Sequence, residues 1–254
     1  MKSAIEKITL GNGLTVLLEN IPHRTSATVG LWLPVGSRFE TKKESGFSHF
    51  VEHMLFKGTK KRHYTELSRA IDRLGGHMNA STSKEITDYY ISLSGRYLPI
   101  ALDVLSDMFF DSLFSKDEFE SEKKVIVEEL KMGEDQPDDF LFDLFYEYQV
   151  GDNSLGRPIA GKPSGIARAT RDDLYAYYCT HYGPEGAVLS EVRFEVRPDG
   201  MIASNRTDAG FQFEEGFTGL VIAVCRLRST CPVDTTFKSL AWWPDADARQ
   251  GRTA

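Results

Sequence analysis

The first forty residues contain short apolar runs that are separated by turn-forming residues. Two of these runs, Ile5 to Leu10 and Leu14 to Glu19, flank the tripeptide Gly11-Asn12-Gly13. Short apolar runs on either side of an Asn-Gly turn predict a β-hairpin. A third run, Ser26 to Val35, alternates loosely between apolar and polar residues and is rich in Val, Leu and Trp. This run predicts another strand.

The pattern becomes helical at Gly46. Apolar residues then recur at spacings of three and four, namely Phe47, Phe50, Val51, Met54 and Leu55. This periodicity predicts an amphipathic helix from Gly46 to Phe56. Ser45 is the expected N-cap, because its hydroxyl could accept a hydrogen bond from a free backbone N–H of the first turn. Gly58 is the expected stop.

The same kind of pattern predicts the elements that follow. Further helices are expected at Tyr64–Leu74, Arg96–Phe110, Lys116–Met132, Phe140–Tyr148 and Arg171–His181. Further strands are expected at His77–Ser81, at Ile86–Ser94 and from Ala187 to Ser190. Hairpins next to pairs of helices are typical of an α+β fold, in which a mixed or antiparallel sheet carries its helices on one face.

The composition excludes some classes of function. The net charge is -7 and no basic stripe is present, so we expect no nucleic-acid partner. No run of about 18 apolar residues is present, so we expect no membrane span. The first seven residues lack an apolar signal-peptide stretch, and the three cysteines are odd in number without a C-x-x-C pair. These features fit a reducing compartment and predict a cytoplasmic location.

The composition also changes near residue 191. Residues 1–190 contain 13 Lys and 9 Arg, whereas residues 191–254 contain 1 Lys and 7 Arg. Helical periodicity fades at the same place, and only Phe217 to Leu227 predicts an element, a strand. We therefore expect one domain over residues 1–190, followed by a divergent tail over residues 191–254.

The segment His49-Phe50-Val51-Glu52-His53 contains the strongest chemical signal. His49 and His53 are four residues apart, so a helix places both imidazoles on one face, one turn apart. Two neutral imidazoles at this spacing can occupy two positions of a tetrahedral zinc ion. Glu52 shares that face, and a carboxylate there can deprotonate a water molecule without binding the metal. We therefore predict a metal site with Glu52 as the catalytic base.

A catalytic zinc ion needs a third protein ligand and one open position. The predicted helix at Lys116–Met132 offers Glu122, Glu128 and Glu129. Glu122 and Glu129 are seven residues apart and share a face, whereas Glu128 points elsewhere. The spacing alone does not choose among these glutamates.

Several further motifs follow one another between Ile8 and Ser190. They are Leu10-Gly11-Asn12-Gly13-Leu14, Gly46 to Thr59 around the histidines, Gly75 to Ser83, Val125 to Leu130, Gly156-Arg157-Pro158-Ile159, and Thr170 to Pro184. In this order they resemble the pitrilysin family of inverzincins, and most closely its mitochondrial-processing-peptidase-like branch. The resemblance implies the α+β fold of the zinc-binding half of that family and one Zn²⁺ per chain.

The resemblance also implies roles for individual residues. The third zinc ligand falls at Glu129, and Glu122 becomes a supporting carboxylate behind the ligands. The strand that contains Asn79 and Ala80 becomes an edge on which a substrate peptide adds as a further strand. The implied activity is that of a zinc metalloendopeptidase that hydrolyses peptides or unfolded protein segments.

The resemblance also implies that full-length members consist of two similar halves. Each half has roughly 200 residues, about one domain. One hypothesis is that the tail at 191–254 is out of frame or degenerate. Another is that a partner subunit or a second copy of the chain supplies the second half. Two alternatives to an enzyme also follow, namely a structural subunit and a module that binds peptides at the Asn79 strand without cleaving them.

Overall fold

The computed structural model describes residues 5–21, 25–151, 153–184 and 186–193. Its strands are β1 (Ile5–Thr9), β2 (Thr15–Asn20), β3 (Ser26–Leu33), β4 (His77–Thr82), β5 (Thr87–Ser94) and β6 (Val188–Arg193). Its α-helices are α1 (Phe47–Leu55), α2 (Tyr64–Asp72), α3 (Leu98–Phe110), α4 (Lys116–Glu134), α5 (Pro137–Val150), α6 (Pro163–Arg168) and α7 (Arg171–His181). The order of elements is that of an α+β protein, as the sequence predicts.

The six strands form a single mixed sheet in the order β1-β2-β6-β3-β5-β4. β1 and β2 form the predicted antiparallel hairpin, and β4 and β5 form a second one. β6 is inserted between β2 and β3, parallel to the first and antiparallel to the second. Because β4 is the last strand in this order, one of its two edges has no partner strand among the described residues.

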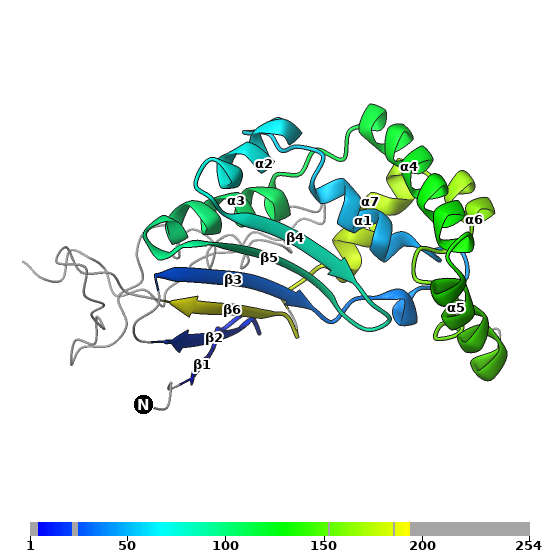
Figure 1. Ribbon diagram of the computed structural model, residues 1–254, viewed down its shortest axis with the longest axis horizontal. Coiled ribbons are helices and arrows are strands. Elements are labelled where there is room, and N and C mark those ends of the chain that lie inside the picture. The colour runs from blue at the N-terminus through cyan, green and yellow to red at the C-terminus, as the bar shows by residue number, and fades with distance from the viewer. Residues whose placement is uncertain (1–4, 22–24, 152, 185, 194–254) are drawn as a thin grey trace, which may run out of the picture.

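Helices α1, α2, α3 and α7 lie over one face of the sheet (Figure 1). Alternate residues of the strands point into the layer between sheet and helices, so Val29, Leu31 and Ile91 are fully buried there. Phe50 and Met54 of α1 enter the same core from the helix side. Helices gathered on one face confirm the predicted architecture. None of the described helices combines the length and apolar character needed to cross a membrane.

The start of α1 differs from the prediction. The N-cap residue is Gly46 rather than Ser45, and its φ of 94° lies in the left-handed region that glycine tolerates. The side chain of Glu40 takes over the capping role, because its two carboxylate oxygens accept hydrogen bonds from the backbone N–H groups of Gly46 and Ser48. Sequence spacing did not reveal this cap, because Glu40 lies six residues before Gly46 and outside the helix.

The other predicted elements are found with small shifts of their ends. α4 and α5 are each somewhat longer than predicted. The short helix α6 was not predicted, because six residues are too few to show a period. β6 extends to Arg193, past the expected domain boundary at residue 190. The predicted strand at Phe217–Leu227 lies outside the described residues.

Candidate metal centre

Helix α1 places three of the predicted site residues on one surface. His49 and His53 are one turn apart, and their ring centroids are 4.6 Å from each other. The opposite side of the helix holds Phe50 and Met54, which are fully buried in the core. This packing fixes the rotation of the helix about its axis, so the histidines are directed toward α4.

Helix α4 supplies the third candidate ligand. The carboxylate Oε2 of Glu129 lies 3.4 Å from Nε2 of His53 and 3.9 Å from Nε2 of His49. One ligand atom from each of the three residues lies within 4.8 Å of the others. A tetrahedral zinc ion with bonds of about 2.0–2.2 Å separates its ligand atoms by about 3.4 Å. Glu128, the neighbouring alternative, instead pairs with Lys131 on the exposed side of α4.

The electrostatic state of His49 suits a metal ligand. Burial, together with a smaller effect of the nearby His53, lowers the pKa of His49 from 6.5 to about 4. The imidazole is therefore neutral at pH 7 and has a free lone pair for a cation. Its Nδ1 atom is buried and has no hydrogen-bond partner among the described residues.

The orientation of His53 is set from behind by Glu122. Nδ1 of His53 lies 3.0 Å from Oε2 of Glu122, whose side chain is almost fully buried. The other oxygen of Glu122 lies 2.5 Å from Nζ of Lys57. Burial raises the pKa of Glu122, but the hydrogen bonds from His53 and Lys57 outweigh it and hold the pKa below its ordinary value. A carboxylate at Nδ1 directs Nε2 of His53 toward the ligand position.

Glu52 lies beside the cluster without being part of it. Burial raises the pKa of Glu52 above its ordinary value, and a hydrogen bond from Thr82 partly offsets this effect. In that bond Oγ1 of Thr82 donates to Oε2 of Glu52. A partly buried carboxylate with a raised pKa is suited to accepting a proton near neutral pH.

Asn79 and Ala80 lie in the middle of β4, at the edge of the sheet next to α1. The side chain of Asn79 is exposed, whereas Ala80 packs against the core. Their proposed contact with substrate stays a prediction.

Three further residues at the site had no role assigned from sequence, namely Lys57, Thr82 and Glu40. Spacing was the available signal for two of them. Lys57 lies four residues after His53, one helical turn further on, and Thr82 lies two residues after Ala80, on the same face of the strand.

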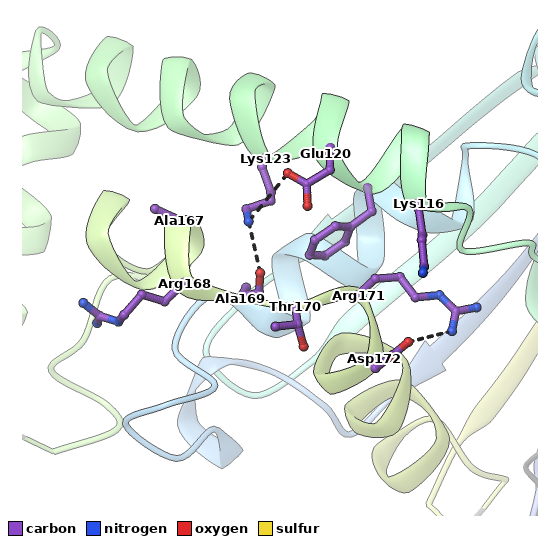
Figure 2. A pocket seen from close by; sticks show the side chains of 10 residues that line it. Lys116, Glu120, Lys123, Ala167, Arg168, Ala169, Thr170, Arg171 and Asp172 are labelled. Atoms are coloured by element: carbon purple, nitrogen blue, oxygen red, sulfur yellow. Dashed lines mark hydrogen bonds and ion pairs between the residues drawn. The ribbon is translucent and has the colours of Figure 1, made fainter.

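A separate pocket with a volume of about 460 Å³ lies between the start of α4 and the α6–α7 connection (Figure 2). It shares no lining residue with the metal cluster. Two of its basic side chains already have partners, since Lys123 donates to the carbonyl of Ala169 and Arg171 pairs with Asp172 (Figure 2). The candidate chemistry therefore resides at the partly exposed His–His–Glu cluster and not in this pocket.

Two histidines and a glutamate converge beside a partly buried glutamate, on a sheet whose helices lie over one face. This is the arrangement expected of zinc-dependent peptidases of the inverted-motif type. The comparison with known proteins agrees with this class. Residues 15–163 match the family described as insulinase (peptidase family M16). The chain belongs to this family.

Its relatives include proteins named as zinc proteases. An uncharacterized zinc protease of Bacillus subtilis, YmxG, is 44% identical over 186 residues, which cover 73% of this chain and 46% of the relative. The β subunit of the mitochondrial-processing peptidase of Lentinula edodes is 40% identical over 181 residues, covering 71% of this chain and 39% of that subunit. This chain thus spans less than half the length of these relatives.

A solved structure gives the same result. The crystal structure of a protease from Helicobacter pylori superimposes with a TM-score of 0.70 at 30% sequence identity. The match covers 75% of this chain and 46% of that protease. The described sheet and helices therefore form one M16 protease domain.

Proposed function

We propose that this chain carries the catalytic zinc site of a metalloendopeptidase, with His49, His53 and Glu129 as ligands of one Zn²⁺ and Glu52 as the base. The observation that carries the proposal is the convergence of the three ligand atoms within 4.8 Å of one another, next to a partly buried glutamate on the helix of the two histidines. Three protein ligands leave a fourth position open, which is the arrangement of catalytic rather than structural zinc.

The side chains divide the chemistry among them. When bound, Zn²⁺ polarises the scissile carbonyl and lowers the pKa of a coordinated water toward about 7. Glu52 takes a proton from the attacking water and passes it to the departing amine. Glu122 and Lys57 keep Nε2 of His53 directed at the ligand position. No covalent acyl-enzyme is needed in this mechanism.

The proposed substrate is a peptide or an unfolded protein segment. Such a segment can add to the free edge of β4 as another strand, near Asn79 and Ala80, which leads its backbone past the metal cluster. The geometry favours extended chains over folded proteins. Strand addition pairs the free edge of β4 with the backbone of the peptide, and a folded protein keeps most of its backbone groups paired internally.

The match covers less than half the length of these relatives. We propose that a second body of about one domain, in the same polypeptide or in a partner subunit, closes over the substrate. Helix α5 supports this proposal, because it exposes many large apolar side chains, namely Phe140, Leu141, Phe142, Leu144, Phe145, Tyr146 and Tyr148. Exposed apolar groups gathered on one element are typical of a protein contact surface.

The test compares the chain with its Glu52→Gln variant, loaded with Zn²⁺ and offered an unstructured peptide. We expect both proteins to bind one Zn²⁺. We expect the variant to cleave the peptide at least about 100-fold more slowly than the unsubstituted chain. Equal cleavage by both would remove Glu52 from the mechanism. Zinc binding without cleavage by either would favour the second candidate function, a peptide-binding or structural subunit.

A further inference from the structure

The carboxylate of Glu52 is held from the sheet rather than from its own helix. Thr82, the last residue of β4, donates a hydrogen bond through Oγ1 to Oε2 of Glu52. Thr82 faces α1 because it alternates with Ala80, which packs against the core on that side. A side chain at the edge of the sheet therefore touches the proposed base directly.

The hydrogen-bond pattern of the hairpin shows which backbone groups of β4 are free. Ser83 donates its backbone N–H to the carbonyl of Ile86, so these two residues form a hydrogen-bonded pair. Thr82 faces Thr87 in the next, non-hydrogen-bonded pair of an unbroken register. The N–H and C=O groups of Thr82 and Ala80 therefore point away from β5 to the free edge, whereas those of Asn79 point toward β5.

Thr82 can thus make two contacts through different atoms. Its backbone groups lie where an added peptide strand would form hydrogen bonds, and its hydroxyl holds one oxygen of the Glu52 carboxylate. Oε2 is fixed by this bond, whereas the second oxygen, Oε1, has no hydrogen-bond partner among the described residues and can take a proton. The residue that contacts the base is therefore also a residue that a substrate strand would contact.

We propose that Thr82 is a positioning residue that fixes the Glu52 carboxylate and links its position to the peptide bound along β4. This proposal rests on the function proposed above. The hydroxyl of Thr82 performs the first task and its outward-facing backbone the second. Thr82 contacts Glu52 and none of the three proposed zinc ligands, so zinc affinity is expected to be independent of the Thr82 hydroxyl.

Two substitutions separate the hydroxyl from the shape of the side chain. Thr82→Val removes the donor and keeps a β-branched residue, whereas Thr82→Ser keeps the donor. The neighbouring Ser81→Ala is a matched control, because the hydroxyl of Ser81 bonds Asp88 on the other face of the strand. Each protein is first checked for one bound Zn²⁺ and an unchanged unfolding temperature.

For Thr82→Val we expect kcat on an unstructured peptide to fall by about 10- to 100-fold, with KM changed less than about twofold. Thr82→Ser and Ser81→Ala are expected to stay near the unsubstituted chain. A Thr82→Val variant with unchanged kcat, or a Thr82→Ser variant as impaired as Thr82→Val, would overturn the proposal.

A second readout does not depend on cleavage. Crystal structures of the zinc-loaded chain and of Thr82→Val are compared at the Glu52 side chain. We expect one ordered carboxylate position in the former and a displaced or multiple position in the latter. The same position in both would refute the role of Thr82 even if no peptide is cleaved, while absent cleavage with the expected displacement would count only against the proposed function.

Discussion

The two histidines of α1 have the same side chain but different surroundings. Nδ1 of His53 faces the Glu122 carboxylate, whereas Nδ1 of His49 is buried without a partner among the described residues. The difference comes from α4, which reaches only one of the two rings from behind. His53 is therefore oriented by a charge, and His49 by the packing around it.

The lowered pKa of His49 predicts how the zinc-free chain responds to acid. The folded state binds a proton at His49 only near pH 4, whereas the unfolded chain binds it near pH 6.5. Between these values the unfolded state carries more protons, so the free energy of unfolding rises with pH across this window. The full difference is at most about 3 to 4 kcal/mol, from about 1.4 kcal/mol per unit of pKa.

Urea unfolding in the presence of a chelator, at several pH values from 4 to 7, measures this effect. The His49→Gln variant is the control, because it lacks the titrating ring and keeps the other acidic groups. We expect the unsubstituted chain to lose more stability than His49→Gln as the pH falls from 6.5 to 4. Parallel curves for the two proteins would show that burial does not lower the pKa of His49.

Lys57 predicts a measurable effect on zinc binding. Its ammonium group holds the Glu122 carboxylate that orients His53. We expect Lys57→Met to raise the zinc dissociation constant by about 10-fold, as is typical when a supporting partner of a ligand is lost. Competition with a chromogenic chelator measures this change.

Lys60→Met is the control for that experiment, because Lys60 forms a more exposed pair with Asp111. Zinc affinity is expected to be unchanged in Lys60→Met. Equal affinities for Lys57→Met and the unsubstituted chain would mean that Glu122 holds His53 without help from Lys57.

At the scale of elements, the entry into α1 determines where the metal ligands lie. Gly46 has a φ of 94°, and a Cβ atom on it would meet the carbonyl oxygen of Ala160 at 2.6 Å and Cδ1 of Ile166 at 2.9 Å. Burial raises the pKa of Glu40, but its two accepted hydrogen bonds favour the carboxylate that caps the helix. The chain is thus fixed tightly three residues before His49.

Substituting glycines tests this constraint. Gly75 also has a positive φ, 69°, but nothing lies within 4 Å of the Cβ it would gain. Gly75→Ala should therefore cost only the left-handed backbone penalty, about 1–2 kcal/mol. Gly46→Ala adds a steric clash and should cost more, about 3 kcal/mol or above. Equal losses in thermal or urea unfolding would show that the contact with Ala160 relaxes at no cost.

The sequence predicted the elements of this site better than its contacts. The period of three and four from Phe47 to Leu55 predicted α1 and the facing pair of histidines, because both depend only on local spacing. Glu129 came from the resemblance rather than from spacing, because the approach of α4 to α1 is a tertiary contact. The contacts of Thr82 and Lys57 were not predicted for the same reason.

At the scale of the whole molecule, β6 determines where the domain can end. This strand lies between β2 and β3 and is the last element of the described residues. Without it, the β1–β2 hairpin loses its connection to the rest of the sheet. We therefore propose that the zinc domain ends just after β6, close to the boundary at residue 190 that the composition predicts.

Two truncated chains test this boundary. A chain that ends at residue 193 is expected to unfold cooperatively and to bind zinc as the full chain does. A chain that ends at residue 184 lacks β6 and is expected to lose cooperative unfolding. Circular dichroism during heating distinguishes them. An unfolded 1–193 chain would show that later residues belong to the domain.

The location of the metal ion tests the central claim most directly. A crystal structure of the zinc-loaded chain, with anomalous data at the zinc edge, would give that location. We expect one peak at about 2.0–2.2 Å from Nε2 of His49, Nε2 of His53 and a carboxylate oxygen of Glu129, with Glu52 close by but not coordinated. A peak at another place, or a zinc ion that Glu52 binds in place of Glu129, would contradict it.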